Sequence, residues 1–166
     1  MTPSSGMRWI LPFFLMATLL HGAAEYPQSG PDIYDPKADG SVQIDAALKQ
    51  AKAENKRVLL KFGANWCSWC RALNALMHEN AEVKAALARD YVVVLVDVNT
   101  RNGVKRNDGV NAKYGNPIQH GLPVLVVLDA NDRPLVTQET GILEEGKGHD
   151  PAKVLAFLAQ WAPSAR

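Results

Sequence analysis

Three short, largely apolar runs, separated by stretches with a helical period, constrain this chain more than any other feature. The runs are Val58–Phe62, Tyr91–Val98 and Val124–Leu128. Each is short and rich in branched residues, which is typical of buried β-strands. The longest, Tyr91–Val98, is too continuous for a half-exposed edge strand, so the sequence predicts that it is central in its sheet.

Helices are expected between these strands. Apolar residues recur at i, i+3, i+4 and i+7 from Ile44 to Ala51, so a helix capped by Ser41 is expected to run to about Asn55. Arg133–Gln138 is expected to form a hairpin with the strand before it. Further helical segments are expected at Cys67–Met77, Asn80–Leu87, Asn111–Tyr114 and Asp150–Trp161. This order predicts an α/β fold with a mixed central sheet flanked by helices.

The N-terminus has the three-part pattern of a secretory signal peptide. A short polar segment with one positive charge precedes the apolar run Trp9–Leu20, and small residues follow up to Ala24. The apolar run is shorter than the ~20 residues of a membrane-spanning helix. We therefore expect residues 1–24 to be a cleaved signal peptide, with an uncleaved anchor as the alternative. Residues 25–40 are expected to form an extended leader and residues 41–162 the folded domain.

Charge and cysteine content exclude several classes of protein. The 166 residues include 18 basic and 17 acidic side chains, with no concentrated basic segment, so no nucleic-acid partner is expected. The two cysteines are too few for a disulfide-rich scaffold or a four-cysteine zinc site. Export to a periplasmic or secreted location would place them where thiols tend to be oxidised. A dithiol there needs a reducing partner or an oxidising role.

Both cysteines lie in the motif Cys67-Ser68-Trp69-Cys70, where an expected strand gives way to an expected helix. Unpaired backbone N–H groups and the helix dipole at such a position favour an anion, so the pKa of the Cys67 thiol is expected to be lowered. The thiolate is the attacking species in disulfide exchange. Cys70 follows one turn later, near enough to close a small disulfide.

Other uses of the cysteine pair are less favoured. A structural disulfide of this spacing would restrain little chain entropy. Haem attachment needs a histidine where this chain has Arg71. A metal site would need further ligands, for which His78, His120 and His149 are candidates by residue type only. We therefore expect redox chemistry on sulfur, with no metal and no dissolved cofactor.

Two segments resemble the thioredoxin family. Val58–Arg71 (VLLKFGANWCSWCR) resembles the family's active-site strand and helix. Lys113–Gly115 followed by Gly121–Val124 resembles its second signature. The resemblance extends over about Ser41–Trp161 and implies a thioredoxin fold. Exported thioredoxin-like proteins and the thioredoxin-like C-terminal domain of the membrane thiol-disulfide transporter are similar in particular.

The resemblance implies a role for each matching residue. Cys67 would be the nucleophile and Cys70 the resolving thiol. Pro123 would follow a cis peptide bond, facing the dithiol and keeping a backbone amide from crowding the sulfurs. Backbone groups near Leu122 would pair with an extended protein substrate. Trp66 would cover one side of the disulfide, with core packing as the alternative.

Lys61 and Trp69 depart from the family pattern. Thioredoxins usually carry a buried acid six residues before the first cysteine, where this chain has Lys61. Lys61 could be a buried cation that lowers the pKa of Cys70, a neutral base, or a side chain that snorkels to the surface. Asp97 is a possible partner for it. Trp69 either selects apolar or unfolded substrates or packs locally.

The segments that flank the second signature are also unusual. Asn116–His120 is longer than the usual link before the family's proline, which could reshape a substrate groove. His120 is expected to be a solvated loop residue, with tuning of the Cys67 thiolate as the alternative. Arg101, Lys105 and Arg106 are expected to form a solvated basic loop.

Taken together, these features predict an exported, monomeric thiol-disulfide oxidoreductase that acts on protein thiols and disulfides. The first choice is a reductant that a membrane thiol-disulfide donor keeps reduced, which the resemblance alone suggests. An oxidant or an isomerase is the second choice. A non-catalytic protein that binds a metal or a partner through the same cysteine pair also stays open.

Overall fold

The structure is a computed structural model that describes residues 30–101 and 103–164. The expected signal peptide, residues 1–24, lies outside the described residues, as do the first five residues of the expected leader. Within the described part of the chain, no helix has both the length and the apolar character that crossing a membrane requires.

The main sheet is mixed, as predicted. Its strands are β1 (Arg57–Gly63), β2 (Tyr91–Asp97), β3 (Val124–Leu128) and β4 (Pro134–Glu139), in the order β2-β1-β3-β4. β1 runs parallel to β2 and antiparallel to β3, and β3 pairs with β4 as the predicted hairpin. A second, two-stranded sheet joins β5 (Glu144–Glu145) to β6 (Gly148–His149). The sequence contained no clear indication of that small sheet.

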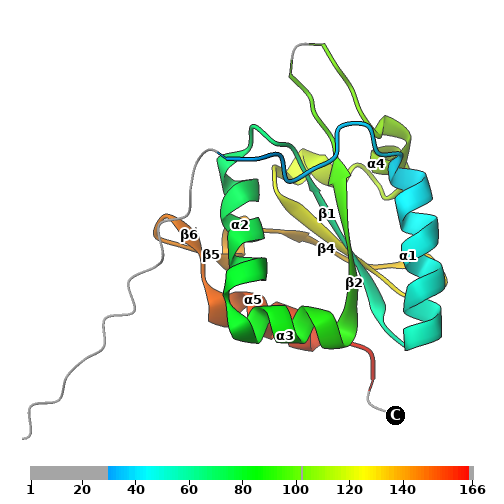
Figure 1. Cartoon of the computed structure of the whole chain (residues 1–166), viewed down its shortest axis with the longest axis vertical. Coiled ribbons are helices and arrows are strands. Elements are labelled where there is room, and N and C mark those ends of the chain that lie inside the picture. The colour runs from blue at the N-terminus through cyan, green and yellow to red at the C-terminus, as the bar shows by residue number, and fades with distance from the viewer. Residues whose placement is uncertain (1–29, 102, 165–166) are drawn as a thin grey trace, which may run out of the picture.

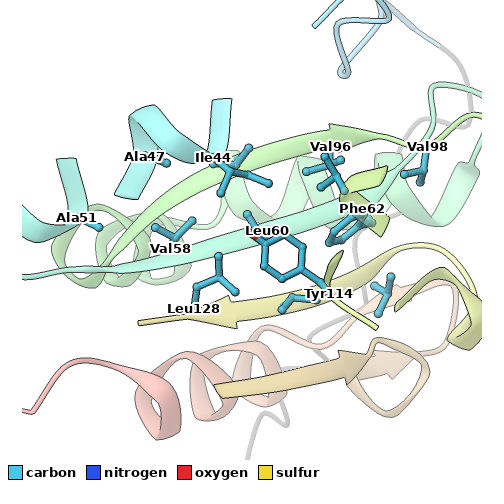
Figure 2. Packing of buried hydrophobic residues seen from close by; sticks show 14 residues of the cluster. Ile44, Ala47, Ala51, Val58, Leu60, Phe62, Val96, Val98, Tyr114 and Leu128 are labelled. Atoms are coloured by element: carbon cyan, nitrogen blue, oxygen red, sulfur yellow. The ribbon is translucent and has the colours of Figure 1, made fainter. Parts of the chain in front are cut away.

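Helices cover both faces of the main sheet (Figure 1). They are α1 (Gly40–Glu54), α2 (Ser68–Glu79), α3 (Ala81–Asp90), α4 (Asp108–Lys113) and α5 (Pro151–Trp161). Side chains alternate between the faces along a strand. Leu60 and Phe62 therefore pack in one cluster with residues of α1 and α4, and Figure 2 shows them on the side of the sheet that α1 covers, while Leu59 packs with α2, α3 and α5.

The prediction that the strand at Tyr91–Val98 is central was wrong. β2 lies at the edge of the four-stranded sheet. Its run of apolar residues reflects cover from helices on both faces: Val94 and Val96 pack in the α1 cluster, whereas Tyr91 packs in the cluster of α2, α3 and α5. Burial of both faces produces a continuous apolar run whether or not a strand pairs on each side.

The predicted helix boundaries need two corrections. α1 is capped by Asp39, not by Ser41, because the Asp39 carboxylate accepts hydrogen bonds from the backbone N–H groups of Ser41 and Val42. The helix expected at Asn111–Tyr114 begins earlier, at Asp108. By contrast, the predicted caps Asn80 and Asp150 are confirmed at the starts of α3 and α5.

Candidate active site

The two cysteines form a disulfide at the start of α2, as the sequence analysis expects. Cys67 is the N-cap residue, and its Sγ accepts a hydrogen bond of 3.1 Å from the backbone N–H of Cys70. The same N–H is placed to stabilise a thiolate. Cys67 is 6% exposed and Cys70 is 0% exposed, so the first sulfur is the accessible one of the pair.

An open groove of about 410 Å³ borders Cys67. Its walls come from the motif itself and from two loops that lie beside it in space: Trp66, Trp69, Thr100, Arg101, Ile118 and Leu122. Tryptophan, isoleucine and leucine side chains make this groove largely apolar, with one cation at its rim. Such a surface suits an extended peptide segment better than a small polar ligand.

Trp66 stands at the rim of the groove and does not pack in the core. It is 39% exposed, and its Nε1 donates a 2.8 Å hydrogen bond to the side-chain oxygen of Asn99. The guanidinium of Arg101 stacks on its ring at 3.8 Å from the centroid. The core-packing alternative for Trp66 is therefore wrong.

The basic segment after β2 is only in part a solvated loop. Arg101 stacks on Trp66, and Arg106 forms an ion pair of 2.7 Å with the buried carboxylate of Asp97. Arg101 and Lys105 are exposed, as expected, and Lys105 lies 3.9 Å from the carboxylate of Asp108. The expectation of a solvated loop was wrong for Arg106, which is half-buried beside Asp97.

Leu122, the residue before Pro123, lines the same groove as Cys67. The Leu122–Pro123 peptide bond is cis. Leu122 also packs against the buried cluster around the disulfide. Pro123 is buried, and its carbonyl oxygen accepts a 2.6 Å hydrogen bond from the hydroxyl of Thr140. These contacts hold the second signature beside the motif.

Trp69 packs locally, which is one of the two alternatives considered for it, and it also lines the groove. One side borders the groove, and its ring packs edge-to-face on His149 of β6, with 5.6 Å between centroids. His149 is buried, and burial together with the charge of Lys61 lowers its pKa to about 4. His149, which the sequence suggested as a metal ligand by residue type only, therefore packs against the motif.

The three histidines do not meet at the cysteines. His78 and His120 are exposed, and Nδ1 of His78 lies 2.7 Å from the carbonyl oxygen of Asn74. The segment with His120 contributes Ile118, two residues earlier, to the groove wall. Among the residues that the structure describes, no three His, Cys, Asp or Glu side chains gather in a group that could hold a metal ion.

Lys61 is buried next to the motif, so of the three alternatives considered for it, the one in which it snorkels to the surface is wrong. Its Nζ donates to the side-chain oxygen of Asn74 at 2.9 Å and to the carbonyl oxygen of Cys70 at 3.4 Å. It also lies 5.3 Å from the centroid of the Tyr34 ring. Burial lowers the pKa of this amine to about 7.

Asp97 is not the partner of Lys61. Its carboxylate binds Arg106 instead, and in the register of the parallel strands Asp97 lies opposite Gly63, while Lys61 lies opposite Leu95. The hydrogen-bond partner of the Lys61 amine is instead the side-chain oxygen of Asn74, which lies one turn after Cys70 on α2. The periodicity of α2 could have placed Asn74 near the motif, but nothing in it indicated the pairing.

Sequence reasoning missed the contribution of the segment before α1. The side-chain oxygen of Asn65 accepts hydrogen bonds from the backbone N–H groups of Ile33 and Tyr34, each 2.9 Å, and its amide donates to the carbonyl oxygen of Tyr34. Arg71 donates to the carbonyl oxygen of Pro31 at 2.8 Å. The leader is therefore tied to the active-site loop, and it crosses that end of the sheet (Figure 1). The aromatic residue within a polar leader was the one available signal.

Comparison with solved structures finds proteins of similar fold. A disulphide isomerase from Xylella fastidiosa Temecula1 superposes with a TM-score of 0.68 at 34% identity, over 77% of this chain and 95% of that chain. The oxidised C-terminal domain of DsbD from Neisseria meningitidis superposes with a TM-score of 0.52 at 22% identity, over 75% of this chain and 97% of that domain. The second likeness shows a shared fold.

Sequence comparison yields shorter matches. The thiol:disulfide interchange protein DsbD of Ralstonia nicotianae is 39% identical over 56 residues, which are 34% of this chain and 9% of that protein. A thioredoxin of Mycoplasmoides gallisepticum is 37% identical over 59 residues, which are 36% of this chain and 55% of that protein. Each match spans less than two thirds of the relative's length.

A family model described as thioredoxin-like matches residues 39–130, more than half of the chain. This segment includes the cysteine motif at the start of α2 and the second signature before β3. The fold that surrounds both is the mixed, helix-covered sheet that the resemblance implies. The chain therefore belongs to the thioredoxin-like family of thiol-disulfide oxidoreductases, with Cys67 and Cys70 as its Cys-x-x-Cys pair.

Proposed function

We propose that this protein is exported and reduces disulfide bonds in other proteins through Cys67 and Cys70. The observation that carries the proposal is the placement of the Cys67 sulfur. It caps α2, accepts the N–H of Cys70 and borders an apolar groove, whereas the Cys70 sulfur is buried beneath it. A sulfur in this position is accessible to a partner and stabilised as a thiolate.

The reaction proceeds by two thiol-disulfide exchanges. The Cys67 thiolate attacks one sulfur of a substrate disulfide, so a mixed disulfide forms and the other substrate sulfur leaves as a thiolate. The Cys70 thiolate then attacks Sγ of Cys67, which releases the second substrate sulfur and closes the Cys67–Cys70 disulfide. Two electrons pass to the substrate, and no dissolved cofactor is needed because they reside on sulfur.

The groove supports a protein substrate. Trp66 and Trp69 offer apolar surface on the side of the motif, and Leu122 offers both a side chain and backbone groups on the facing wall. An extended substrate segment that pairs with the backbone near Leu122 would present its disulfide to Cys67. Pro123, which has no backbone N–H, would leave the sulfurs free of a competing donor.

Direction and location are further parts of the proposal. The N-terminal pattern of residues 1–24 supports export to the periplasm or secretion. A reductant outside the cytosol must receive electrons, and a membrane thiol-disulfide donor fits that need. The 39% identity to part of an interchange protein supports this kind of donor.

Disulfide isomerisation is a second candidate because the disulphide isomerase of Xylella fastidiosa is covered over 95% of its length at 34% identity. Isomerisation uses the same attack by Cys67, but the mixed disulfide is resolved by another thiol of the substrate. Recovery of activity from scrambled ribonuclease would separate isomerisation from simple reduction of insulin.

Insulin reduction driven by dithiothreitol tests the proposed activity. We expect the wild-type protein to accelerate precipitation of the insulin B chain, and the Cys67→Ser variant to fall to the uncatalysed rate. The Cys70→Ser variant should accumulate a mixed disulfide with substrate, since the resolving sulfur is missing. Equal rates for wild type and Cys67→Ser would favour the binding function that uses the same pair.

The reduction potential of the couple tests the direction. Equilibration with glutathione should place it near the value of about −270 mV found for thioredoxin, not near the value of about −120 mV of a strong oxidant. A value close to the latter would contradict the proposed reductant. Cell fractionation of the full-length chain, with N-terminal sequencing of the product, tests export and cleavage after Ala24.

A further inference from the structure

We propose that Tyr34 belongs to the active site and that, in the reduced protein, its hydroxyl donates a hydrogen bond to the Sγ of Cys70. This inference deepens the proposed function, on which it rests, because it concerns the dithiol form of the same cysteine pair. It assigns a chemical task to the leader segment before α1, which lies outside the motifs that the sequence analysis identified.

The hydroxyl of Tyr34 and the sulfur of Cys70 both lie close to the position that a Cβ atom on Gly63 would occupy. A Cβ atom built on Gly63 would clash with the Tyr34 hydroxyl and would lie 2.8 Å from Sγ of Cys70. Tyr34, Cys67 and Cys70 also form one buried cluster. The absence of a side chain at Gly63, the last residue of β1, therefore leaves the space in which the two groups approach each other.

The Tyr34 hydroxyl lacks a partner while the disulfide is closed. Tyr34 is 1% exposed, and its hydroxyl oxygen has no hydrogen-bond partner within the described ranges of the chain. A buried hydroxyl without a partner is destabilising. A disulfide sulfur is at best a weak acceptor, whereas a thiolate forms strong, charge-assisted hydrogen bonds. Opening the disulfide would thus supply the missing acceptor.

The charged and titratable groups around the hydroxyl favour a donor role. Burial and the charge of Asp97 raise the pKa of Tyr34 well above its usual range, so the phenol keeps its proton at neutral pH. Lys61 of β1 lies over the ring, and it also donates to the Cys70 carbonyl. A hydroxyl donor thus lies close to the Cys70 sulfur, and a buried amine binds the backbone carbonyl of the same residue.

Hydrogen bonds hold Tyr34 in place before any reaction occurs. Asn65, two residues before Cys67, binds the backbone of Ile33 and Tyr34 through three hydrogen bonds of 2.9 Å. Arg71 donates to the carbonyl oxygens of Asn65 and Pro31. The active-site loop and the leader therefore form one unit, and the donor is pre-organised toward the resolving sulfur.

The hydrogen bond has a defined thermodynamic consequence. Because it forms in the reduced protein and not in the oxidised one, it stabilises the reduced state and makes the couple more oxidising. It also lowers the pKa of Cys70, since the donor favours the thiolate over the thiol. Removing the hydroxyl should reverse both effects while leaving the ring, and its contact with Lys61, in place.

The Tyr34→Phe variant tests the inference. We expect its equilibrium with glutathione to shift about tenfold toward the disulfide, which is about 30 mV more negative for a two-electron couple. The pKa of Cys70, followed by thiolate absorbance in the reduced protein, should rise. Urea unfolding should show that the reduced form loses stability relative to wild type, whereas the oxidised form, whose hydroxyl had no partner, does not.

Tyr91→Phe is the matched control. Tyr91 is also buried, but it begins β2 at the opposite end of the sheet from Gly63, and its hydroxyl donates a 2.6 Å bond to the carbonyl oxygen of Leu158. This variant should lose stability equally in both redox states and keep the wild-type potential. A folded Tyr34→Phe protein with an unchanged potential and an unchanged Cys70 pKa would overturn the inference.

The two proposals fail in different ways. If the wild-type protein did not reduce insulin, the proposed function would be wrong, yet the shift in potential could still be measured with glutathione alone. If insulin reduction depended on Cys67 but Tyr34→Phe left the potential where it was, the function would stand and the role of Tyr34 would not.

Discussion

Lys61 places an amine in the protein interior, where it binds the backbone carbonyl of Cys70. Its hydrogen bonds go to a neutral amide and to a carbonyl oxygen, so no carboxylate compensates its charge among the contacts that the structure shows. Burial disfavours the charged form, which is why its pKa falls to about 7. Two of the three roles considered for Lys61 thus persist: a cation near Cys70 and a neutral base.

Replacing Lys61 by methionine should make the oxidised protein more stable at neutral pH. The pKa of Lys61 is about 7 when folded and about 10.5 when unfolded, so the unfolded chain binds more protons between these values. Wild-type stability should therefore rise with pH across that window, by up to about 1.4 kcal/mol per unit. Lys61→Met should be more stable by about 2 kcal/mol at pH 7 and lose its advantage toward pH 10.

Urea unfolding of both oxidised proteins at pH 7, 8, 9 and 10 measures this difference. Lys52→Met, on the exposed side of α1, is the control and should follow the wild-type curve at each pH. Curves for Lys61→Met and wild type that stay parallel over the whole range would show that the buried amine does not titrate there. In the reduced protein, an unchanged Cys70 pKa would remove Lys61 from the mechanism.

At the scale of helices and strands, caps determine where each element starts. Asn80 ends α2 and caps α3 with its side-chain oxygen, and Asp150 caps α5 ahead of Pro151. These residues were predicted from sequence because each immediately precedes an apolar helical pattern. The start of α1 was mistaken because Asp39 and Ser41 are both good caps, and only the backbone conformation distinguishes them.

We expect Asp39→Ala to destabilise the protein by about 1 kcal/mol, since two backbone N–H groups of α1 lose their acceptor. Ser41→Ala should change the unfolding free energy by less than about 0.5 kcal/mol, because Ser41 lies inside the helix and on the surface. Chemical unfolding of the two variants measures the difference. Equal losses of unfolding free energy, or a larger loss for Ser41→Ala, would show that Asp39 is not the residue that caps α1.

At the scale of the whole molecule, the site is assembled from parts that are far apart in the chain. The groove joins α2 to the loop after β2 and to the segment before β3, while the leader and β6 approach the motif from other sides. Figure 1 shows how the segment before α1 crosses the end of the sheet near the start of α2. Conditions that destabilise the packing of one of these segments against the motif should therefore affect the entire site.

Acid should destabilise the protein through His149. Its pKa is about 4 when folded, below the value of about 6.5 for an unfolded chain, so the unfolded state binds more protons between these values. Stability present above pH 6.5 is therefore lost as the pH falls toward 4, by about 2 kcal/mol. His149→Leu, which places an apolar side chain that does not titrate against Trp69, should flatten this part of the curve.

Thermal unfolding between pH 7 and pH 4 checks this expectation, and His120→Leu provides a control because His120 is exposed. A His149→Leu protein that loses as much stability in acid as wild type would show that other groups cause the loss. A His120→Leu protein that flattened the curve would place the responsible group on the segment before β3.

The sequence by itself determined the fold class and the cysteine pair. Continuous apolar runs, helical periodicity and caps are local properties, so β1, β3, the hairpin to β4 and α5 could all be predicted from residues near in sequence. The motif needed only its position between a strand and a helix. These predictions depend on backbone geometry within one element, which neighbouring residues largely decide.

Tertiary structure alone decided what surrounds the sulfurs. An apolar run reports that both faces are buried, not which strands lie beside it, so β2 could not be placed at the sheet edge from sequence. Likewise, the placement of Tyr34 beside the motif depends on its contacts with Asn65, about 30 positions away. The burial of Lys61 depends on packing of β1 against α2, where Cys70 and Asn74 bind its amine. Such contacts arise from packing of whole elements, and no local pattern encodes them.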